Sequence, residues 1–195
     1  MRINNIDLDN NIYKQFLDAQ KVEVLKDRIR YINHIFKSNY YTKIILTLSE
    51  KFFGNKNQKE KMFWVSAASD GENIYIFSDK LGKNEDLVEL MIHEYVHICV
   101  DRTFSSECPI WLNEGLAMWF SGQSSNTAEE KVDNISNFYY ANQYTTDKFY
   151  NKANYIIKRV LNHISVNQLI DQMRYCKNFY SDSIVGIQNI QLLLQ

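Results

Sequence analysis

The chain has 195 residues, of which 45% are hydrophobic and 23% are charged, and its formal net charge is −1. These values predict one globular domain with a substantial core and exclude a disordered chain. A net charge near zero argues against nucleic acid or an anionic membrane surface as a partner. No apolar run approaches the roughly 20 residues that a transmembrane helix needs.

The amino-terminal segment and the cysteines indicate the compartment. The first 15 residues, MRINNIDLDNNIYKQ, are polar and acidic and lack the charged-then-apolar order of a signal peptide. Cys99, Cys108 and Cys176 are an odd number without metal-binding spacing, so we expect free thiols buried as small hydrophobic residues. A cytoplasmic location is therefore expected, although a chain trimmed of its leader would look the same.

The first part of the chain is expected to form one helix and about three strands. From Leu17 to about Phe36, apolar residues recur at helical spacing. The segment 43–53 is rich in β-formers, and strands at 62–69 and 73–78 are expected to be joined by a hairpin turn at Asp70-Gly71-Glu72. The strand 73–78 is also expected to present an edge to which an extended substrate can add.

The remainder of the chain is expected to be helical. Asn84 is a suitable N-cap for a helix from Glu85 to about Val100. Pro109, the only proline, suits the first turn of a second helix that ends near Gly122.

Three further helices follow in the prediction. The run 149–164 has apolar residues along one face, and capping boxes open two more helices at Thr127-x-x-Glu130 and Ser165-x-x-Gln168. We therefore predict an α+β fold, with the whole chain, 1–195, as one domain. Its two lobes are an α+β lobe over 1–101 and a helical lobe over 102–195, meeting near Asp101.

The helix 85–100 carries the polar residues that indicate chemistry. It is apolar around nearly its whole circumference, which is typical of a buried helix. His93 and His97 lie four residues apart on one face, and Glu94 flanks them. Buried polar groups need partners, and a divalent metal bound by both imidazoles would provide one. The spacing His-Glu-x-x-His is that of a zinc hydrolase, in which the glutamate takes a proton from water.

A catalytic zinc site needs a third protein ligand, and Glu114 is the candidate. It lies in the apolar run WLNEGLAMWF, where an unpaired charge would be costly. Its neighbour Gly115 weakens the helix by about 1 kcal/mol relative to alanine, which we attribute to a close approach to the metal helix. The alternative is that Glu114 pairs with a basic neighbour.

These two segments resemble the gluzincin metallopeptidases. His93-Glu94-Tyr95-Val96-His97, followed by Trp111-Leu112-Asn113-Glu114-Gly115-Leu116-Ala117, is most similar to the M1-aminopeptidase-like and peptidase MA branch, over roughly residues 62–175. The resemblance implies a zincin-like fold, with Zn²⁺ held by His93, His97 and Glu114. It also implies that Tyr150, in Tyr150-Asn151-Lys152-Ala153, stabilises the oxyanion of the reaction.

The chain also departs from the M1 pattern. Only 16 residues separate His97 from Glu114, and the G-x-M-E-N segment that holds a substrate's amino terminus is absent. Gly71-Glu72-Asn73 lies in a comparable place but is interpreted as the hairpin turn. Aminopeptidase specificity is therefore not implied, and cleavage within a peptide is an equal expectation.

Several roles stay open at this point. Tyr150 borders an apolar helix face, so core packing is the alternative to an oxyanion role. His163 could take that role instead, but it lies about 20 Å further along the helix, and it is otherwise expected, like His34, to be an ordinary surface or packing residue. Asp101 is expected either to accept a hydrogen bond from a ligand imidazole or to pair with Arg102 or another basic surface residue.

The sequence therefore predicts a zinc metallopeptidase that acts on peptide or protein substrates. Glu94 is expected to take the proton of the attacking water and pass it to the leaving amine, with Zn²⁺ as cofactor. The rival hypothesis is a catalytically inactive, zinc-containing binding or regulatory module. A purely structural zinc site is disfavoured by a glutamate base beside an open coordination position.

Overall fold

The structure is a computed structural model that describes residues 1–53, 66–82, 85–104, 107–123, 138 and 147–193. Within these ranges every strand precedes residue 78, and every element from residue 87 onward is a helix. The mixed α+β composition predicted from the sequence is therefore confirmed. The predicted capping box at Thr127-x-x-Glu130 lies outside the described residues.

The strands form one sheet in the order β1-β2-β3-β5-β4. The two outer pairs, β1 with β2 and β4 with β5, are antiparallel, whereas β3 is parallel to both of its neighbours. The strands are β1 (Arg2–Ile3), β2 (Ile6–Leu8), β3 (Thr42–Thr47), β4 (Ala67–Ser69) and β5 (Asn73–Phe77). Strands β1 and β2 were not predicted, because two or three residues are too few to show an alternating pattern.

The segment 43–53 is only partly a strand, which corrects the sequence prediction. Strand β3 ends at Thr47, and Ser49–Phe53 form the short helix α3. The backbone N–H and the hydroxyl of Ser49 donate to the Asp79 carboxylate, at 2.8 and 2.5 Å. These bonds fix the turn after β3, and Phe53 then packs against Phe77 of β5 with ring centroids 5.1 Å apart. Tertiary contacts thus override the β-forming composition.

Strand β5 does not present the free edge that the sequence suggested. It is paired with β3 on one side and with β4 on the other, so both of its edges are occupied. The strand at the end of the sheet is β4. The hairpin turn between β4 and β5 is confirmed, because the Asp70 carboxylate accepts hydrogen bonds from the backbone N–H groups of Glu72 and Asn73 and Gly71 has a φ of +86°.

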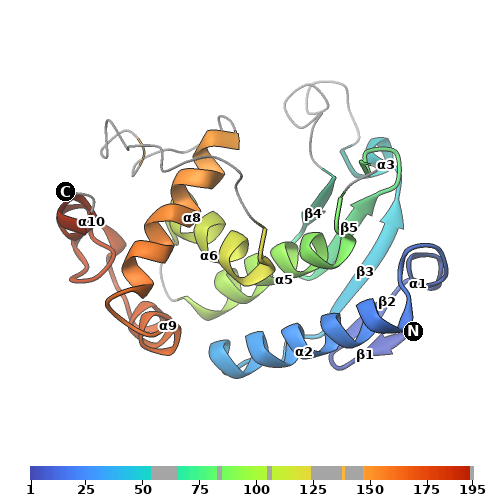
Figure 1. The fold of residues 1–195 in the computed structure, drawn as a ribbon, viewed down its shortest axis with the longest axis horizontal. Coiled ribbons are helices and arrows are strands. Elements are labelled where there is room, and N and C mark those ends of the chain that lie inside the picture. Colours follow the sequence, from blue (N-terminus) through green and yellow to red (C-terminus); the bar gives the residue numbers. More distant parts are fainter. Residues whose placement is uncertain (54–65, 83–84, 105–106, 124–137, 139–146, 194–195) are drawn as a thin grey trace.

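Helix α5 (Leu87–Thr103) is the central helix of the molecule. It contacts α2 (Ala19–Phe36), strands β4 and β5, and α6 (Ile110–Ser121), so it lies between the sheet and the helical part (Figure 1). Twelve of its 17 residues are buried, as expected for a helix that is apolar on all sides. Its N-cap is Asp86, whose carboxylate accepts from Val88 and Glu89, so the predicted start at Glu85 is two residues early.

A ring of buried and half-buried polar side chains holds α5 in place. The Tyr95 hydroxyl donates to Asn33 of α2 at 2.6 Å, Asn33 donates to Asn5 at 2.8 Å, and Asn5 donates back to the Tyr95 oxygen at 2.7 Å. Burial raises the pKa of Tyr95, so the phenol stays protonated and can donate. Because Asn5 lies between β1 and β2, the ring joins α5 to both α2 and the sheet, and it fixes the helix that carries His93 and His97.

The carboxyl-terminal helices pack against α6 and against α2. They are α8 (Asp147–Leu161), α9 (Val166–Arg174) and α10 (Ile187–Leu193), and α8 lies directly against α6. The capping box at Ser165 and Gln168 is confirmed. Helix α6 begins after Pro109 and ends at Gly122, whose φ of +75° is that of a left-handed C-cap. The predicted helix limits therefore hold within a few residues.

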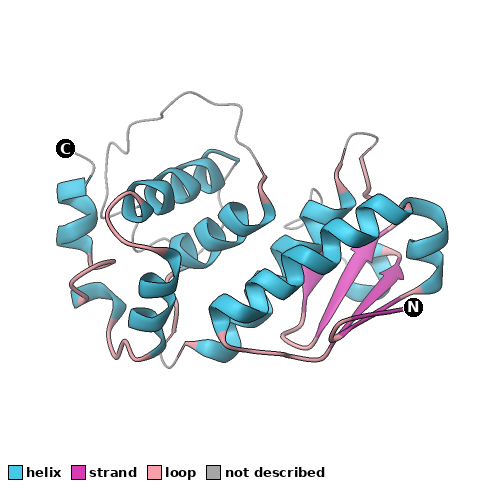
Figure 2. Cartoon of the chain, turned by 60° about the horizontal axis from the view of Figure 1, so that its bottom comes forward, coloured by secondary structure: helices cyan, strands magenta, loops and turns pink. Residues whose placement is uncertain are grey.

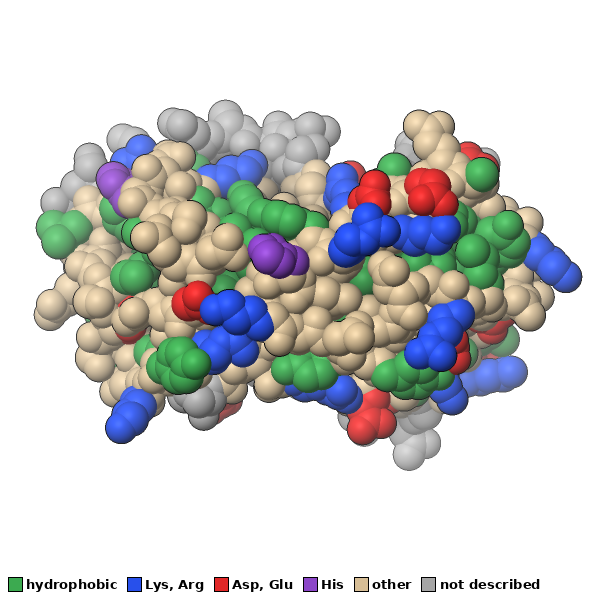
Figure 3. Space-filling model, turned by 90° about the horizontal axis from the view of Figure 1, so that it is seen from below, with side chains coloured by type: hydrophobic (Ala, Val, Ile, Leu, Met, Phe, Trp, Pro, Cys, Tyr) green, Lys and Arg blue, Asp and Glu red, His purple; other side chains and the backbone are tan. Residues whose placement is uncertain are grey.

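The surface of the α2 side carries charges of both signs. Figure 2 shows α2 lying across the sheet, and Figure 3 views this side with basic side chains beside acidic ones over its length. One such pair is Lys37 with Asp171, at 2.7 Å. In the described part of the chain, no helix combines the length and the apolar character needed to cross a bilayer.

Candidate metal centre

Helix α5 brings the two histidines of the motif to a common point. His93 and His97 are one helical turn apart, and their ring centroids lie 4.7 Å from each other. One ligand atom of each, together with a Glu94 carboxylate oxygen, lies within 4.8 Å of the other two. His93 and Glu94 are buried, with 7% and 8% of their surface exposed. These three residues could hold a metal ion, whereas the sequence predicted the two histidines as ligands and Glu94 as the base beside them.

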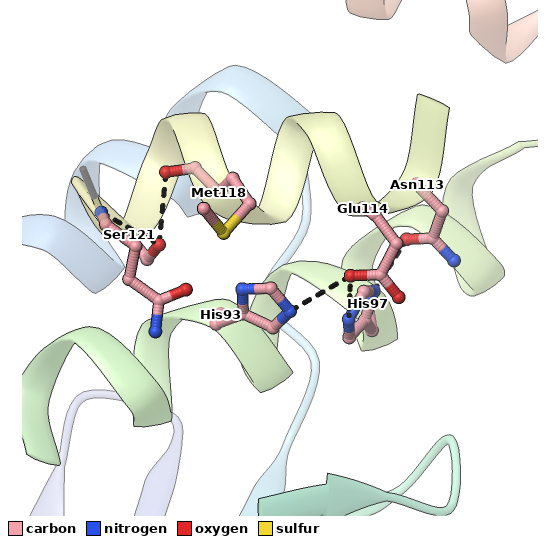
Figure 4. Close-up of polar contacts among 7 residues, drawn as sticks. His93, His97, Asn113, Glu114, Met118 and Ser121 are labelled. Carbon is pink, nitrogen blue, oxygen red and sulfur yellow. Dashed lines mark hydrogen bonds and ion pairs between the residues drawn. The ribbon is translucent and has the colours of Figure 1, made fainter. Parts of the chain in front are cut away.

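Helix α6 supplies a carboxylate to the same point. The Glu114 Oε2 lies 3.2 Å from Nε2 of His93 and 3.6 Å from Nε2 of His97. Figure 4 shows the Glu114 side chain extending from its helix toward both rings. Only 3% of Glu114 is exposed, and a carboxylate buried to this degree requires a cation or several donors. The prediction that Glu114 joins the two histidines agrees with this arrangement.

The hydrogen bond on the other side of His97 determines what its Nε2 can do. Nδ1 of His97 lies 2.7 Å from Oδ1 of Asn113, a carbonyl oxygen that can only accept, so Nδ1 carries the hydrogen. A neutral His97 then presents the lone pair of Nε2 toward the lone pairs of Glu114. Two acceptors facing each other repel unless a cation lies between them. Either a second proton on His97 or a metal ion satisfies this arrangement.

The distances among the three side chains suit zinc. Two ligand atoms that are each about 2.0–2.1 Å from a tetrahedral zinc ion lie about 3.3–3.4 Å apart. The separations of Glu114 Oε2 from the two imidazole nitrogens, 3.2 and 3.6 Å, fall on either side of this value. Two neutral imidazoles and one carboxylate are also the donor set of many catalytic zinc sites. The residues present therefore fit this metal.

Asn113 is a site residue that the sequence analysis missed. It holds His97 in the tautomer that frees Nε2, and its side chain also hydrogen-bonds Asp101. Asp101 is exposed; partial desolvation raises its pKa, despite the opposing effects of His97 and of that hydrogen bond. Asp101 therefore reaches the imidazole through Asn113 rather than directly. Arg102, its other proposed partner, instead lies 5.3 Å from the ring centroid of Tyr40 and 3.9 Å from Glu72.

The two histidines differ in their surroundings. Burial by itself lowers the pKa of His97, but the nearby charges of Glu114 and Glu94 outweigh it, so that the pKa is raised. A proton thus competes for the position between His97 and Glu114. Nδ1 of His93, by contrast, is buried without a hydrogen-bond partner among the described residues. The nearby Met118, drawn in Figure 4, offers only a weakly accepting sulfur.

A cavity of about 340 Å³ opens beside His93 and Glu94. Strand β4 contributes Ala67 to its wall, α5 contributes Leu90, and α6 contributes Met118. Tyr150, at the start of α8, lines the same cavity, so the tyrosine predicted from its sequence context lies beside the candidate metal centre. The cavity is large enough to receive part of a peptide, and its wall combines apolar side chains with polar and charged ones.

Gly115 makes a close approach, but to a different helix from the one predicted. A Cβ atom on Gly115 would lie 2.5 Å from Cγ1 of Ile157 and 2.7 Å from the carbonyl oxygen of Ala153. Both residues belong to α8, whereas the sequence analysis expected the approach to be toward α5. The glycine therefore seats α8 against α6, which in turn places Tyr150 at the cavity. Glu114 reaches the histidines from the neighbouring position without help from this contact.

The two other histidines lie away from the site. His34 and His163 are both solvent-exposed, as expected for surface residues. His163 follows the end of α8 at Leu161, more than three turns beyond Tyr150. Of these two candidates for the oxyanion role, Tyr150 lines the cavity and His163 does not.

Comparison with known proteins adds no identification. Neither protein-family models, nor curated proteins, nor solved structures give a significant match to this chain. The interpretation of the site therefore depends on its own residues and their geometry.

Proposed function

We propose that this protein is a zinc-dependent peptidase with a zincin-like fold. The observation that carries the proposal is the approach of Glu114, from α6, to Nε2 of both His93 and His97, with the Glu94 carboxylate beside them on the cavity wall. Three side chains from two helices supply a zinc donor set, and a fourth, acidic group is left to act on a proton. Such a division between ligands and base is typical of hydrolytic zinc sites and not of structural ones.

Each residue has one role in the proposed chemistry. His93, His97 and Glu114 would hold the ion, which when bound acidifies a water molecule and polarises a carbonyl group. Glu94 accepts the proton of the attacking water and delivers it to the amine that leaves. The Tyr150 hydroxyl donates a hydrogen bond to the oxygen that becomes negative as the carbonyl carbon turns tetrahedral. Asn113 keeps the His97 ring in the required tautomer and orientation.

The end strand of the sheet supports a peptide substrate. Ala67 and Ser66, at the start of β4, line the cavity together with His93. Strand β4 pairs with β5 on one side, and the sheet ends at β4 within the described residues. An extended peptide that added to β4 by backbone hydrogen bonds would pass the candidate metal centre with its carbonyl groups aligned along the strand. In this proposal β4, and not the segment 73–78 that the sequence suggested, is the sheet edge to which the substrate adds.

The proposal is tested by pairing metal analysis with peptide digestion. The purified protein should contain about one zinc per chain and cleave members of a mixed peptide library, and a chelator should abolish cleavage. Glu94→Gln should retain the zinc and lose at least about a hundredfold in kcat/KM, because the proton acceptor is gone. Glu89→Gln is the matched control, since Glu89 is on the same helix and does not line the cavity.

The outcomes separate the peptidase from the inactive module. Full hydrolysis by Glu94→Gln, or hydrolysis that survives complete removal of metal, would contradict the proposed mechanism. Stoichiometric zinc in a protein that cleaves no peptide in the library would instead favour the zinc-containing binding module.

A further inference from the structure

Two glutamates line the cavity beside the candidate metal centre. Glu85 lines it just before α5 begins, and Glu94 lines it next to the histidines. No lysine or arginine is among the described residues that line this cavity. Two carboxylates without a basic side chain give the cavity a negative potential, which favours a cation among the groups that enter it.

The Glu85 carboxylate is held in position by two neutral donors. The Ser66 hydroxyl donates to its Oε1 at 2.6 Å, and the backbone N–H of Gly82 donates to its Oε2 at 2.8 Å. Within the described part of the chain, no lysine or arginine nitrogen lies within 4 Å of it. Each carboxylate oxygen has further lone pairs available. The carboxylate is thus oriented by neutral donors, and no basic side chain of the described residues pairs with it.

The wall between Glu85 and the metal centre is aliphatic. Leu90 lies on α5 between Glu85 and His93, and Met118 faces the same cavity from α6. Along the helix axis, the rise from Leu87, where α5 begins, to His93 is about 9 Å, and Glu85 lies two residues before this start. One extended substrate residue with a long side chain can cover much of this distance, its methylene stem lying on the apolar wall and its charged end at Glu85.

We propose that Glu85 is the residue that determines substrate specificity, and that it selects peptides with a lysine or arginine side chain close to the bond at the metal centre. The inference builds on the proposed function, because it concerns the substrate of the same site. A cation on a long aliphatic stem matches both the acid and the apolar wall. A free amino terminus carries the same charge without the stem, so the two sources can be separated by acetylating the peptide.

The test measures binding, so that it does not depend on hydrolysis. The zinc-loaded Glu94→Gln protein is titrated into fluorescent, amino-terminally acetylated alanine peptides that contain a single lysine, norleucine or glutamate. Norleucine keeps the stem of lysine and removes the charge. The lysine peptide should bind about five- to twentyfold more tightly than the norleucine peptide, the range between an exposed ion pair and a charge-assisted hydrogen bond in a partly desolvated site. The difference should shrink as salt is added.

Adding Glu85→Gln should reduce the preference for lysine to less than about twofold while leaving the affinity for the norleucine peptide unchanged. The norleucine affinity also reports whether the variant is folded. Glu23→Gln is the matched control, because it removes the same charge from an exposed position on α2, where Glu23 pairs with Lys26. This variant should keep the preference.

Each result bears on a different claim. Equal binding of lysine and norleucine peptides, a preference that survives Glu85→Gln, or absence of binding by every peptide would overturn the inference. A preference seen only with a free amino terminus would reassign Glu85 to amino-terminus recognition and also overturn it. If lysine peptides bind as expected but the intact protein never cleaves them, the peptidase proposal fails while the cation site stands.

Discussion

Replacing Gly115 with alanine tests the packing that places the cavity wall. The substitution has two effects of opposite sign on the free energy of unfolding. Alanine favours a helix over glycine by about 1 kcal/mol, so propensity alone predicts a more stable protein. The new methyl group, however, would lie 2.5 Å from Cγ1 of Ile157 and 2.7 Å from the Ala153 carbonyl oxygen, whereas carbon atoms in good contact are about 3.5–4.0 Å apart.

The steric effect should win because one of the two obstructing atoms belongs to a backbone. The Ile157 side chain can turn aside, but the Ala153 carbonyl moves only if α8 moves as a whole. Overpacking of a buried site costs about 1–3 kcal/mol. Because both contacts are closer than 3.0 Å, we take the upper part of this range, about 2–3 kcal/mol. After the gain in propensity of about 1 kcal/mol is subtracted, Gly115→Ala should lower the free energy of unfolding by about 1–2 kcal/mol. A shift of α8 would also displace Tyr150, and a misplacement of about 1 Å can reduce catalysis by about a hundredfold.

The assay is urea unfolding of the metal-free protein, followed by circular dichroism, with kcat/KM measured in parallel on the zinc-loaded form. Ile157→Ala removes one of the two clashing atoms. Gly115→Ala should therefore lower the free energy of unfolding less in the Ile157→Ala background than in the native protein. The contact with the Ala153 carbonyl oxygen would keep part of the effect. A Gly115→Ala protein that is as stable as the parent, or more stable, would refute the close packing of α6 on α8. The same conclusion would follow if the two substitutions were strictly additive.

Three further predictions concern the metal centre. Asn113→Ala should weaken zinc binding about 10–100-fold, because His97 loses the acceptor that fixes its tautomer. Competition with a chelator measures this affinity, and one ion should still bind at saturation. An unchanged affinity would exclude this role for Asn113. Zinc at 100 times its Kd should raise the free energy of unfolding by about 2.7 kcal/mol relative to the chelated protein. If zinc does not shift the midpoint of thermal unfolding, the folded protein does not bind it at such a site. The raised pKa of His97 in the metal-free fold means that its contribution to stability is fully present below its unfolded pKa of about 6.5 and is lost as the pH rises through the folded value. The chelated protein should therefore lose stability through that range in urea titrations, and His97→Ala should remove this dependence; an unaltered profile in the variant would contradict the assignment.

The sequence alone determined the part of the site that lies on one helix. The positions of His93, Glu94 and His97 follow from the helical period, because residues three and four apart share a face. The burial of α5 followed from its apolar composition, and the need of a buried carboxylate for a cation identified Glu114. These inferences require only local geometry and the cost of desolvation, and both can be evaluated from the order of the residues.

The tertiary structure decided everything that depends on the meeting of distant segments. Asn113 adjoins Glu114 in the chain, yet its bond to His97 appears only when α6 lies beside α5. Gly115 was recognised as a close contact, but its partner is α8, and the strand at the sheet end is β4 because β5 is enclosed. Glu85 is one acidic residue among many until the fold places it on the wall of the same cavity as His93. Such pairings depend on the angles and registers at which elements pack, and one sequence carries no periodic signal that reveals them.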